Sequence, residues 1–304
     1  MGLIWPNWMT YEPDGLKPGA LENASLKTKR QAARDVLTAV NGIALLGPDD
    51  GVVWRGQGDI DWRLESKAAR LGMTPDELVE HETAMIKEAR RIGAEGAQHM
   101  GDWEILAKMR HHGAATRLID VTTDPMIALW FLCDDDADTD DGNVRDKTGL
   151  LLALQRNVFT PIKSPHERES YKRLTTKERA RLIYSTPPID PRIAAQRGLF
   201  VLHSHPVDDT VSEMSELGDF SMPSRGNWKR KPIEQLEAMC GPKIPDERRG
   251  RTRTHFPEAI GVVVPPVVKE VLLKMLEVNF GFTRSTIYPD FSGIGQVYAT
   301  KQVL

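Results

Sequence analysis

The stretch HHGAATRLIDVTTDPMIALWF, residues 111–131, places a dense group of polar side chains directly before an apolar segment. Thr-Asp-Pro at 123–125 is typical of a helix start, because Thr and Asp cap a first turn and proline fits its first position. Residues 126–131 follow without a helix breaker and are apolar, which predicts a buried helix beginning at Thr123. The polar residues would then lie at the entrance of this helix.

Such an entrance favours an anion, since its free N–H groups and the helix dipole attract phosphate or carboxylate. Arg117 and Arg55 could add paired hydrogen bonds, so the pattern is compatible with a nucleotide diphosphate. The structural alternative is that Thr123 is only a cap and Asp120 only the ion-pair partner of Arg117. No metal site is predicted, because adjacent histidines point differently and no Cys or Glu stands at ligand spacing.

A second polar group follows the segment GVVWRG, residues 51–56, which has the β-branched and aromatic content of a short strand ending at a turn. Arg55 would sit at the strand end, either in a site or as an ordinary surface arginine. Gly56 to Gly58 is too short for a dinucleotide-binding fingerprint, and the chain has no P-loop signature and no Gly-x-Ser-x-Gly elbow. These absences weigh against kinase, dehydrogenase and hydrolase chemistry.

The remaining patterns mix helices and strands at irregular spacing. Helices are predicted at 26–40, capped by Ser25, over 75–109 with a break near 93–101, at 267–276, and from Ile294 onward. Core strands are predicted at 149–154, 199–202 and 259–264, whereas Pro and Gly predict an irregular course for residues 1–20. The sequence therefore predicts an α+β fold: a single interrupted domain with a small mixed sheet flanked by helices.

Within this fold we assign residues 1–45 to an N-terminal irregular segment and helix, and residues 46–304 to the main domain. Residues 205–258 form an insertion rich in Pro, Gly, Ser and charge, with a short helical pattern near 233–239. Its basic part, residues 225–253, would contact nucleic acid or simply be a solvated loop. An acidic run at 134–141 is its counterpart elsewhere in the chain.

Composition bears on the partners of the chain and on its cellular location. The 304 residues carry a formal net charge of −3, so the whole chain has no electrostatic reason to seek nucleic acid. No run approaches the roughly 18 apolar residues that cross a bilayer, and we expect no membrane partner. Cys133 and Cys240 lie far apart without metal-ligand spacing. A reducing, cytoplasmic location is therefore expected.

Several of these motifs, in order, resemble the FRG domain family, which is named for an aromatic-Arg-Gly motif, here Trp54-Arg55-Gly56. The stretch 111–120 resembles the family's His-Gly and Thr-Arg-Leu-hydrophobic-Asp core, and 122–131 its Thr-x-x-Pro-x-x-Ala-Leu-x-Phe pattern. Residues 191–200 resemble its Gln-x-Gly-x-Phe strand, and 288–293 its closing Pro-Asp element. The resemblance implies an FRG-type domain from about residue 50 to 300 and constrains fold more than function.

A weaker resemblance is to ADP-ribosyltransferases, whose first motif is an aromatic-Arg-Gly at a strand end. Thr122-Thr123 with Ala128 and Phe131 is similar to their second motif. This implies an ADP-ribosyltransferase-like core with NAD as substrate, in which Arg55 holds the NAD phosphates or nicotinamide ribose. Many such enzymes have a catalytic Glu on a late strand; here Gln196 is the motif candidate, with Asp120 or Glu258 as substitutes.

The resemblance thus implies an effector or toxin that transfers ADP-ribose from NAD to a nucleic acid or protein, in phage defence and with an antitoxin as partner. The alternatives are a non-catalytic nucleotide or nucleic-acid binding module, and a nuclease-like effector using His111 or His112. The expected catalytic residues are Arg55, Asp120, Thr122 and Gln196. The expected NAD-binding residues are Trp54, Arg55, Gly56, His111, His112, Arg117, Thr122 and Thr123.

Overall fold

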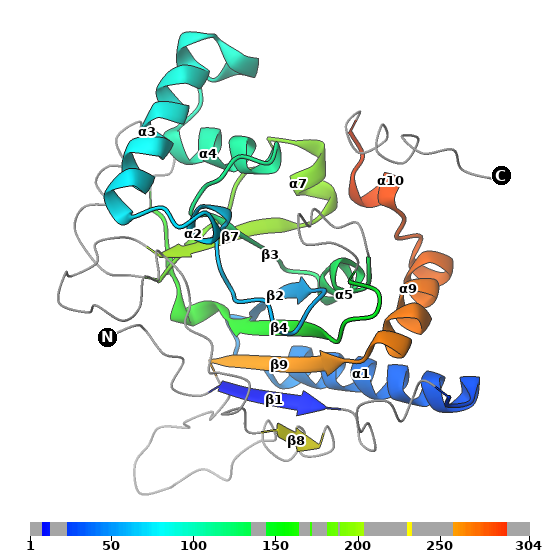
Figure 1. Ribbon diagram of the computed structural model, residues 1–304. Coiled ribbons are helices and arrows are strands. Elements are labelled where there is room, and N and C mark those ends of the chain that lie inside the picture. Colours follow the sequence, from blue (N-terminus) through cyan, green and yellow to red (C-terminus); the bar gives the residue numbers. More distant parts are fainter. Residues whose placement is uncertain are drawn as a thin grey trace, which may run out of the picture.

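The computed structural model describes residues 8–12, 23–134, 144–163, 171, 181–187, 189–203, 230–232 and 258–290. Its described strands form one mixed sheet in the order β5-β6-β7-β3-β2-β4-β9-β1-β8 (Figure 1). The strands are β1 (Trp8–Glu12), β2 (Val52–Gln57), β3 (Ile119–Thr122), β4 (Gly149–Gln155), β5 (Thr160–Pro161), β6 (Arg181–Tyr184), β7 (Gly198–His203), β8 (Arg230–Pro232) and β9 (Ala259–Val264). β1 runs parallel to β8 and β9, and β5 to β6, whereas the other pairs are antiparallel.

Helices cover the sheet. They are α1 (Leu26–Leu46), α2 (Lys67–Arg70), α3 (Pro75–Arg91), α4 (Asp102–His111), α5 (Pro125–Cys133), α7 (Pro191–Ala195), α9 (Pro266–Phe280) and α10 (Arg284–Ile287), with 3-10 turns at Ala94–Gly96 and Arg156–Val158. Ser25 caps α1, and Thr74 caps α3 in a reciprocal capping box with Glu77. No helix in the described part of the chain is long and apolar enough to cross a membrane.

The sheet is curved around its own side chains. One face forms a single cluster, in which Val53 of β2 and Leu152 of β4 join Val121 of β3 and Val201 of β7. The opposite face is divided between two helix layers. On β2, β4 and β9 it packs against α1, α5 and α9, and on β6 and β7 against α3 and α4. Figure 1 shows α1 and α3 on opposite sides of the molecule, with the strands between them.

The two halves of the sheet meet only narrowly. β2 pairs with β4 over six residues, from Val52 to Gln57, but with β3 only through Trp54 and Thr122. Because the backbone groups beyond this single bridge are not joined, the sheet opens between the ends of β2 and β3. This opening positions the candidate site.

The fold confirms the predicted α+β class, a mixed sheet flanked by helices. The strands predicted near 51–56, 149–154, 199–202 and 259–264 are present, as are the helices predicted at 26–40 and 267–276 and the helical region at 75–109 with its break. An ADP-ribosyltransferase-like core remains a prediction.

Two local predictions were wrong. Residues 1–20 are not wholly irregular, since β1 pairs with β9 and β8, contacts between distant segments that no local pattern announces. α5 begins at Pro125 rather than Thr123, because the Asp124 carboxylate accepts the Met126 N–H and is the cap. The helices predicted near 233–239 and from Ile294 lie outside the described residues, as does most of the insertion. The division at residue 45 remains a prediction.

Candidate functional site

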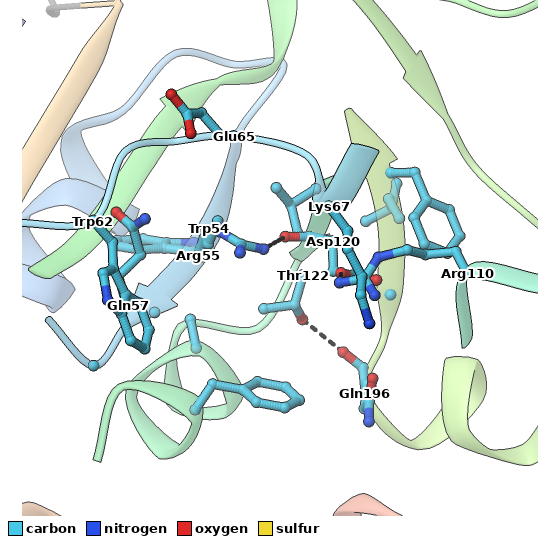
Figure 2. A pocket seen from close by; sticks show the side chains of 18 of the residues that line it. Trp54, Arg55, Gln57, Trp62, Glu65, Lys67, Arg110, Asp120, Thr122 and Gln196 are labelled. Carbon is cyan, nitrogen blue, oxygen red and sulfur yellow. Dashed lines mark hydrogen bonds and ion pairs between the residues drawn. The ribbon is translucent and has the colours of Figure 1, made fainter. Parts of the chain in front are cut away.

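A cavity of about 540 Å³ lies where β2 and β3 part, a volume within the range of small-molecule sites. It is walled by β2, the loop that follows β2, the end of α4, β3, α5, α7 and Tyr288. Figure 2 shows residues from these elements around the space. The cavity brings together segments that are far apart in the sequence, as a ligand site does.

Strand alternation aims Arg55 into this space. Trp54 is buried toward α5, whereas its neighbours Val53 and Arg55 turn to the opposite face of β2. Arg55 Nη1 donates a 2.6 Å hydrogen bond to the backbone carbonyl of Asp120, across the opening. Its Nε is buried without a hydrogen-bond partner, and Arg55 forms no ion pair among the described residues. It is therefore a buried cation with donor capacity to spare.

Burial shifts the pKa of Arg55. It lowers the pKa of the guanidinium to about 10, an effect that the Asp120 carboxylate opposes and that Arg110 and Arg70 reinforce. Arg55 therefore stays protonated at neutral pH, but at a desolvation cost. An anion in the cavity would relieve that cost.

The other three predicted catalytic residues are held by neighbours. Asp120 receives a 2.7 Å ion pair from Arg110, and Thr122 Oγ1 donates to the Gln196 carbonyl at 2.7 Å while accepting the backbone N–H of Asp124. The Gln196 side-chain amide donates to the Ile287 carbonyl at 3.2 Å. All three line the cavity. Thr122 ties the end of β3 to the turn that follows α7, so it orders the cavity wall.

Close packing of α5 against β2 requires a glycine at position 56. A Cβ added at this position would lie 1.9 Å from the Ala128 carbonyl oxygen and 2.7 Å from the Leu132 nitrogen. α5 therefore crosses β2 at a distance that only glycine allows. Gly56 lines the cavity, but the absence of a side chain there is required by helix packing before any ligand is considered.

The cavity wall carries an excess of positive charge. Six basic residues line it, against four acidic ones. Asp134 is compensated from outside by a bidentate pair with Arg284, and Asp120 from within by Arg110. The basic residues are Arg55, Arg63, Lys67, Arg70, Arg110 and Arg192, and the acidic ones Asp61, Glu65, Asp120 and Asp134. Such a wall suits an anionic ligand.

Arg117 corrects two expectations. It is only 1% exposed and does not line the cavity. Its backbone N–H and Nε donate to the two carboxylate oxygens of Glu82, and Nη2 donates to the Tyr171 hydroxyl. Desolvation opposes its charge, but Glu82 and Tyr171 outweigh it and raise the pKa of Arg117. The guanidinium is thus committed to the core, so it neither reaches a ligand nor pairs with Asp120.

The predicted residues before the helix divide similarly. His111 lines the cavity, whereas His112 and Thr123 do not, and both of these are exposed. Thr123 is not the cap of α5 either. Trp54, Arg55, Gly56, His111 and Thr122 are therefore brought together, and His112, Arg117 and Thr123 are not.

Sequence reasoning missed the loop after β2 and the aromatic floor of the cavity. Trp62, Glu65 and Lys67 come from the loop and the start of α2, and Tyr288 follows α10. The sequence did offer a signal for the loop, because Arg55 lies two residues before the end of β2 and several polar residues follow within the next ten positions. Glu258, a substitute candidate for a catalytic carboxylate, instead pairs with Arg181 at 3.0 Å and does not line the cavity.

Comparison with known proteins places the family motifs. The family model of the FRG domain matches residues 50–141, which span β2 through α5 and hold much of the cavity wall. The chain therefore carries an FRG domain over these residues. The similar motifs at 191–200 and 288–293 lie beyond the match. Neither the curated proteins nor the solved structures contained a match to the chain.

Proposed function

We propose that the FRG domain at residues 50–141, with the segments that complete its cavity, forms an ADP-ribosyltransferase-like site that takes NAD as its substrate. The observation that carries the proposal is the environment of Arg55. This residue is a buried guanidinium aimed into the cavity, anchored through one nitrogen to Asp120 and bearing an unused Nε–H. A diphosphate or ribose oxygen beside the guanidinium would accept a hydrogen bond from it and offset the desolvated charge.

The rest of the wall suits a dinucleotide. The excess of basic side chains offsets the pyrophosphate, and Trp62, Phe131 and Tyr288 supply aromatic faces for the two rings. Phe131 and Tyr288 lie edge to face at 6.1 Å between centroids, so they form one continuous apolar wall. Thr122 keeps β3 in place beside Arg55 through its bonds to Gln196 and Asp124.

Transfer would break the bond between the ribose anomeric carbon and the nicotinamide nitrogen, with the electron pair leaving on nicotinamide. A nucleophile of the acceptor would form the new bond to the same carbon and lose its proton. Positive charge builds on the ribose in the transition state, and a fixed carboxylate nearby stabilises it. Asp120 is bound by Arg110, so we propose Glu65 as this carboxylate, since it lines the cavity and its contact with exposed Arg63 is weak.

We extend the proposal to the setting of the reaction. The acceptor would be a nucleic acid or a protein, and the chain would act as a cytoplasmic effector or toxin in phage defence, restrained by an antitoxin. The Cys133 side chain is buried, and a buried thiol suits a reducing compartment. The roles of the cavity residues are the same whatever the acceptor and the setting are.

One observation favours the alternative of a non-catalytic nucleotide-binding module. Among the four predicted catalytic residues, the only carboxylate is that of Asp120, and Arg110 holds it in a 2.7 Å ion pair. A pocket with Arg55 but with no carboxylate that acts on the ribose, Glu65 included, would bind NAD without transferring ADP-ribose. Transfer and binding must therefore be measured separately.

The test is incubation of the purified chain with NAD labelled in its adenylate half, together with total RNA, DNA or cell lysate. Arg55→Gln and the charge-matched control Arg156→Gln are run alongside, because Arg156 is exposed and outside the cavity. Label transfer that Arg55→Gln abolishes and Arg156→Gln preserves supports the proposal and names the acceptor class. Binding without transfer supports the non-catalytic module. If the chain neither binds NAD nor transfers the label, NAD is refuted as the ligand.

A further inference from the structure

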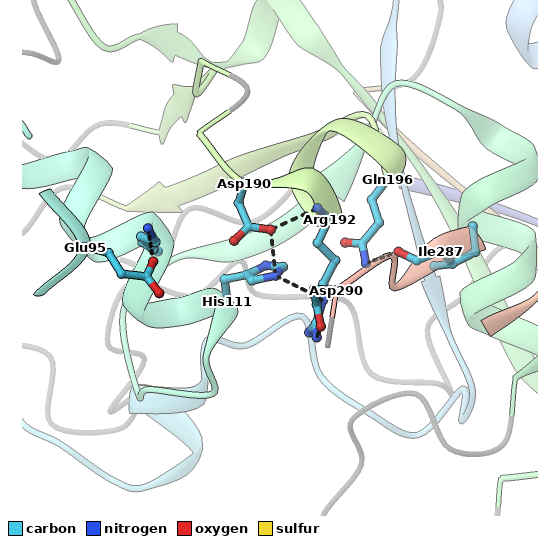
Figure 3. A network of polar contacts seen from close by, with 8 residues as sticks. Glu95, His111, Asp190, Arg192, Gln196, Ile287 and Asp290 are labelled. Atoms are coloured by element: carbon cyan, nitrogen blue, oxygen red, sulfur yellow. Dashed lines mark hydrogen bonds and ion pairs between the residues drawn. The ribbon is translucent and has the colours of Figure 1, made fainter. Parts of the chain in front are cut away.

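Three side chains from distant segments converge beside the cavity. His111 ends α4, Asp190 precedes α7, and Asp290 follows α10. One nitrogen and two carboxylate oxygens of these residues all lie within 4.8 Å of one another. Figure 3 shows the imidazole of His111 between the two carboxylates.

His111 contributes to this cluster a ring nitrogen that could coordinate a metal ion. Its side chain is only 8% exposed, and its Nε2 is buried with no hydrogen-bond partner among the described residues. Nε2 lies 3.3 Å from Asp190 Oδ1 and 4.0 Å from Asp290 Oδ2, but without hydrogen-bond geometry. Burial lowers the pKa of His111, an effect that Asp190 opposes.

We propose that His111, Asp190 and Asp290 bind a divalent transition-metal ion at the edge of the cavity. An imidazole nitrogen with two carboxylate oxygens is a ligand set for zinc or manganese. In a tetrahedral zinc site with bonds of about 2.0–2.1 Å, neighbouring ligand atoms lie about 3.3 Å apart. The Nε2 to Asp190 Oδ1 distance of 3.3 Å already has this value.

The surroundings orient these ligands. Arg192 donates to both oxygens of Asp290, at 2.5 and 2.8 Å, and its guanidinium lies 4.8 Å from the centre of the Tyr288 ring. Asp190 accepts the Arg192 backbone N–H at 2.9 Å, which fixes its rotamer. Outer hydrogen bonds of this kind hold metal ligands in place. Two carboxylates against one guanidinium leave a net negative charge, which a divalent cation offsets.

The position of the ion follows from its ligands. His111 and Arg192 both line the cavity, so the bound ion would add positive charge to a wall already rich in it. The sequence predicted no metal here because the three ligands are about 80 and 100 residues apart and no local spacing joins them. The three side chains would bind the ion whether or not the cavity takes NAD.

The experiment is isothermal titration of the full chain with zinc chloride, and separately with manganese chloride, in the absence of any nucleotide. We expect one saturable site, lost or weakened at least tenfold in His111→Gln and in Asp190→Asn. Asparagine still caps a helix, so Asp190→Asn removes the charge and keeps the start of α7. The matched control is His112→Gln, at the exposed neighbouring histidine, which should bind as the unaltered chain does.

A melting curve gives the second measurement, because an ion that binds only the folded chain raises its Tm. Zinc should raise the Tm of the unaltered chain and of His112→Gln, but not of Asp190→Asn. If neither metal binds at one saturable site, or if His112→Gln weakens binding as much as His111→Gln, the site does not exist. Should His111→Gln fail to fold, Asp190→Asn decides.

Discussion

Arg55 Nη1 and the backbone carbonyl oxygen of Asp120 are joined by a 2.6 Å hydrogen bond across the opening between β2 and β3. This bond holds the guanidinium at the cavity wall although no carboxylate neutralises it there among the described residues. A buried charge without an ion-pair partner lowers the stability of the fold, and an anionic ligand that pairs with it gains binding energy.

The first prediction concerns this cost. Burial lowers the pKa of Arg55 to about 10 in the folded chain, below its ordinary value of 12.5. The unfolded chain therefore binds more protons between these two pH values, and stability rises with pH only there; at neutral pH the buried charge lowers stability in full. Arg55→Met should leave the free energy of unfolding unchanged or raise it by about 1–2 kcal/mol in urea denaturation at pH 7. A loss above about 2 kcal/mol would show that Arg55 supports the fold.

The second prediction concerns Gly56. Gly56→Ala should destabilise the chain by about 3 kcal/mol or more, because its Cβ would collide with the backbone of α5 at Ala128 and Leu132. The control is Gly198→Ala, whose Cβ would meet its nearest neighbours at an ordinary 3.7 Å. Urea denaturation compares the two, and equal stabilities would mean that α5 does not lie on β2 as described.

The third prediction concerns the buried Glu82–Arg117 pair. Arg117→Met alone should cost about 3–5 kcal/mol, because it leaves the Glu82 carboxylate buried without its cation. Arg117→Met with Glu82→Met should recover a large part of that loss, since no uncompensated charge remains. Urea denaturation of the single and double variants forms the measurement, and a double variant no more stable than the single would contradict the assignment.

The fourth prediction separates two carboxylates. Glu65→Gln should lower the rate of ADP-ribose transfer about 100-fold or more while changing the NAD affinity little, because the amide keeps the shape and loses the charge. Asp120→Asn should have the smaller effect on the rate, since Arg110 already engages that carboxylate. Single-turnover rates and titrated affinities provide the comparison. The reverse order would return the catalytic role to Asp120.

The sequence predicted best what short segments determine. The caps Ser25 and Thr74, the core strands β4, β7 and β9, and the strand ending near Arg55 follow from local patterns, and all are present. The nearness of Arg55 to Asp120 and Thr122 was also expected, although from a family resemblance rather than from spacing.

Distant pairing was beyond those patterns. Arg117 resembled a phosphate ligand because its partner Glu82 lies 35 residues earlier, on α3, whereas Arg117 lies in the connection between α4 and β3. The cluster of His111, Asp190 and Asp290 was missed for the same reason, and so was β1, whose partners are near the other end of the chain. Local chemistry identifies candidate residues, but the fold decides which of them share a site.

The central claim is that Arg55 makes the cavity a binding site for NAD. Isothermal titration of the purified chain with NAD tests it most directly, with Arg55→Gln and the exposed control Arg156→Gln measured under the same conditions. The account predicts saturable binding that Arg55→Gln weakens at least tenfold and that Arg156→Gln preserves. Absence of NAD binding by the folded, unaltered chain, or equal affinity in Arg55→Gln, would contradict it.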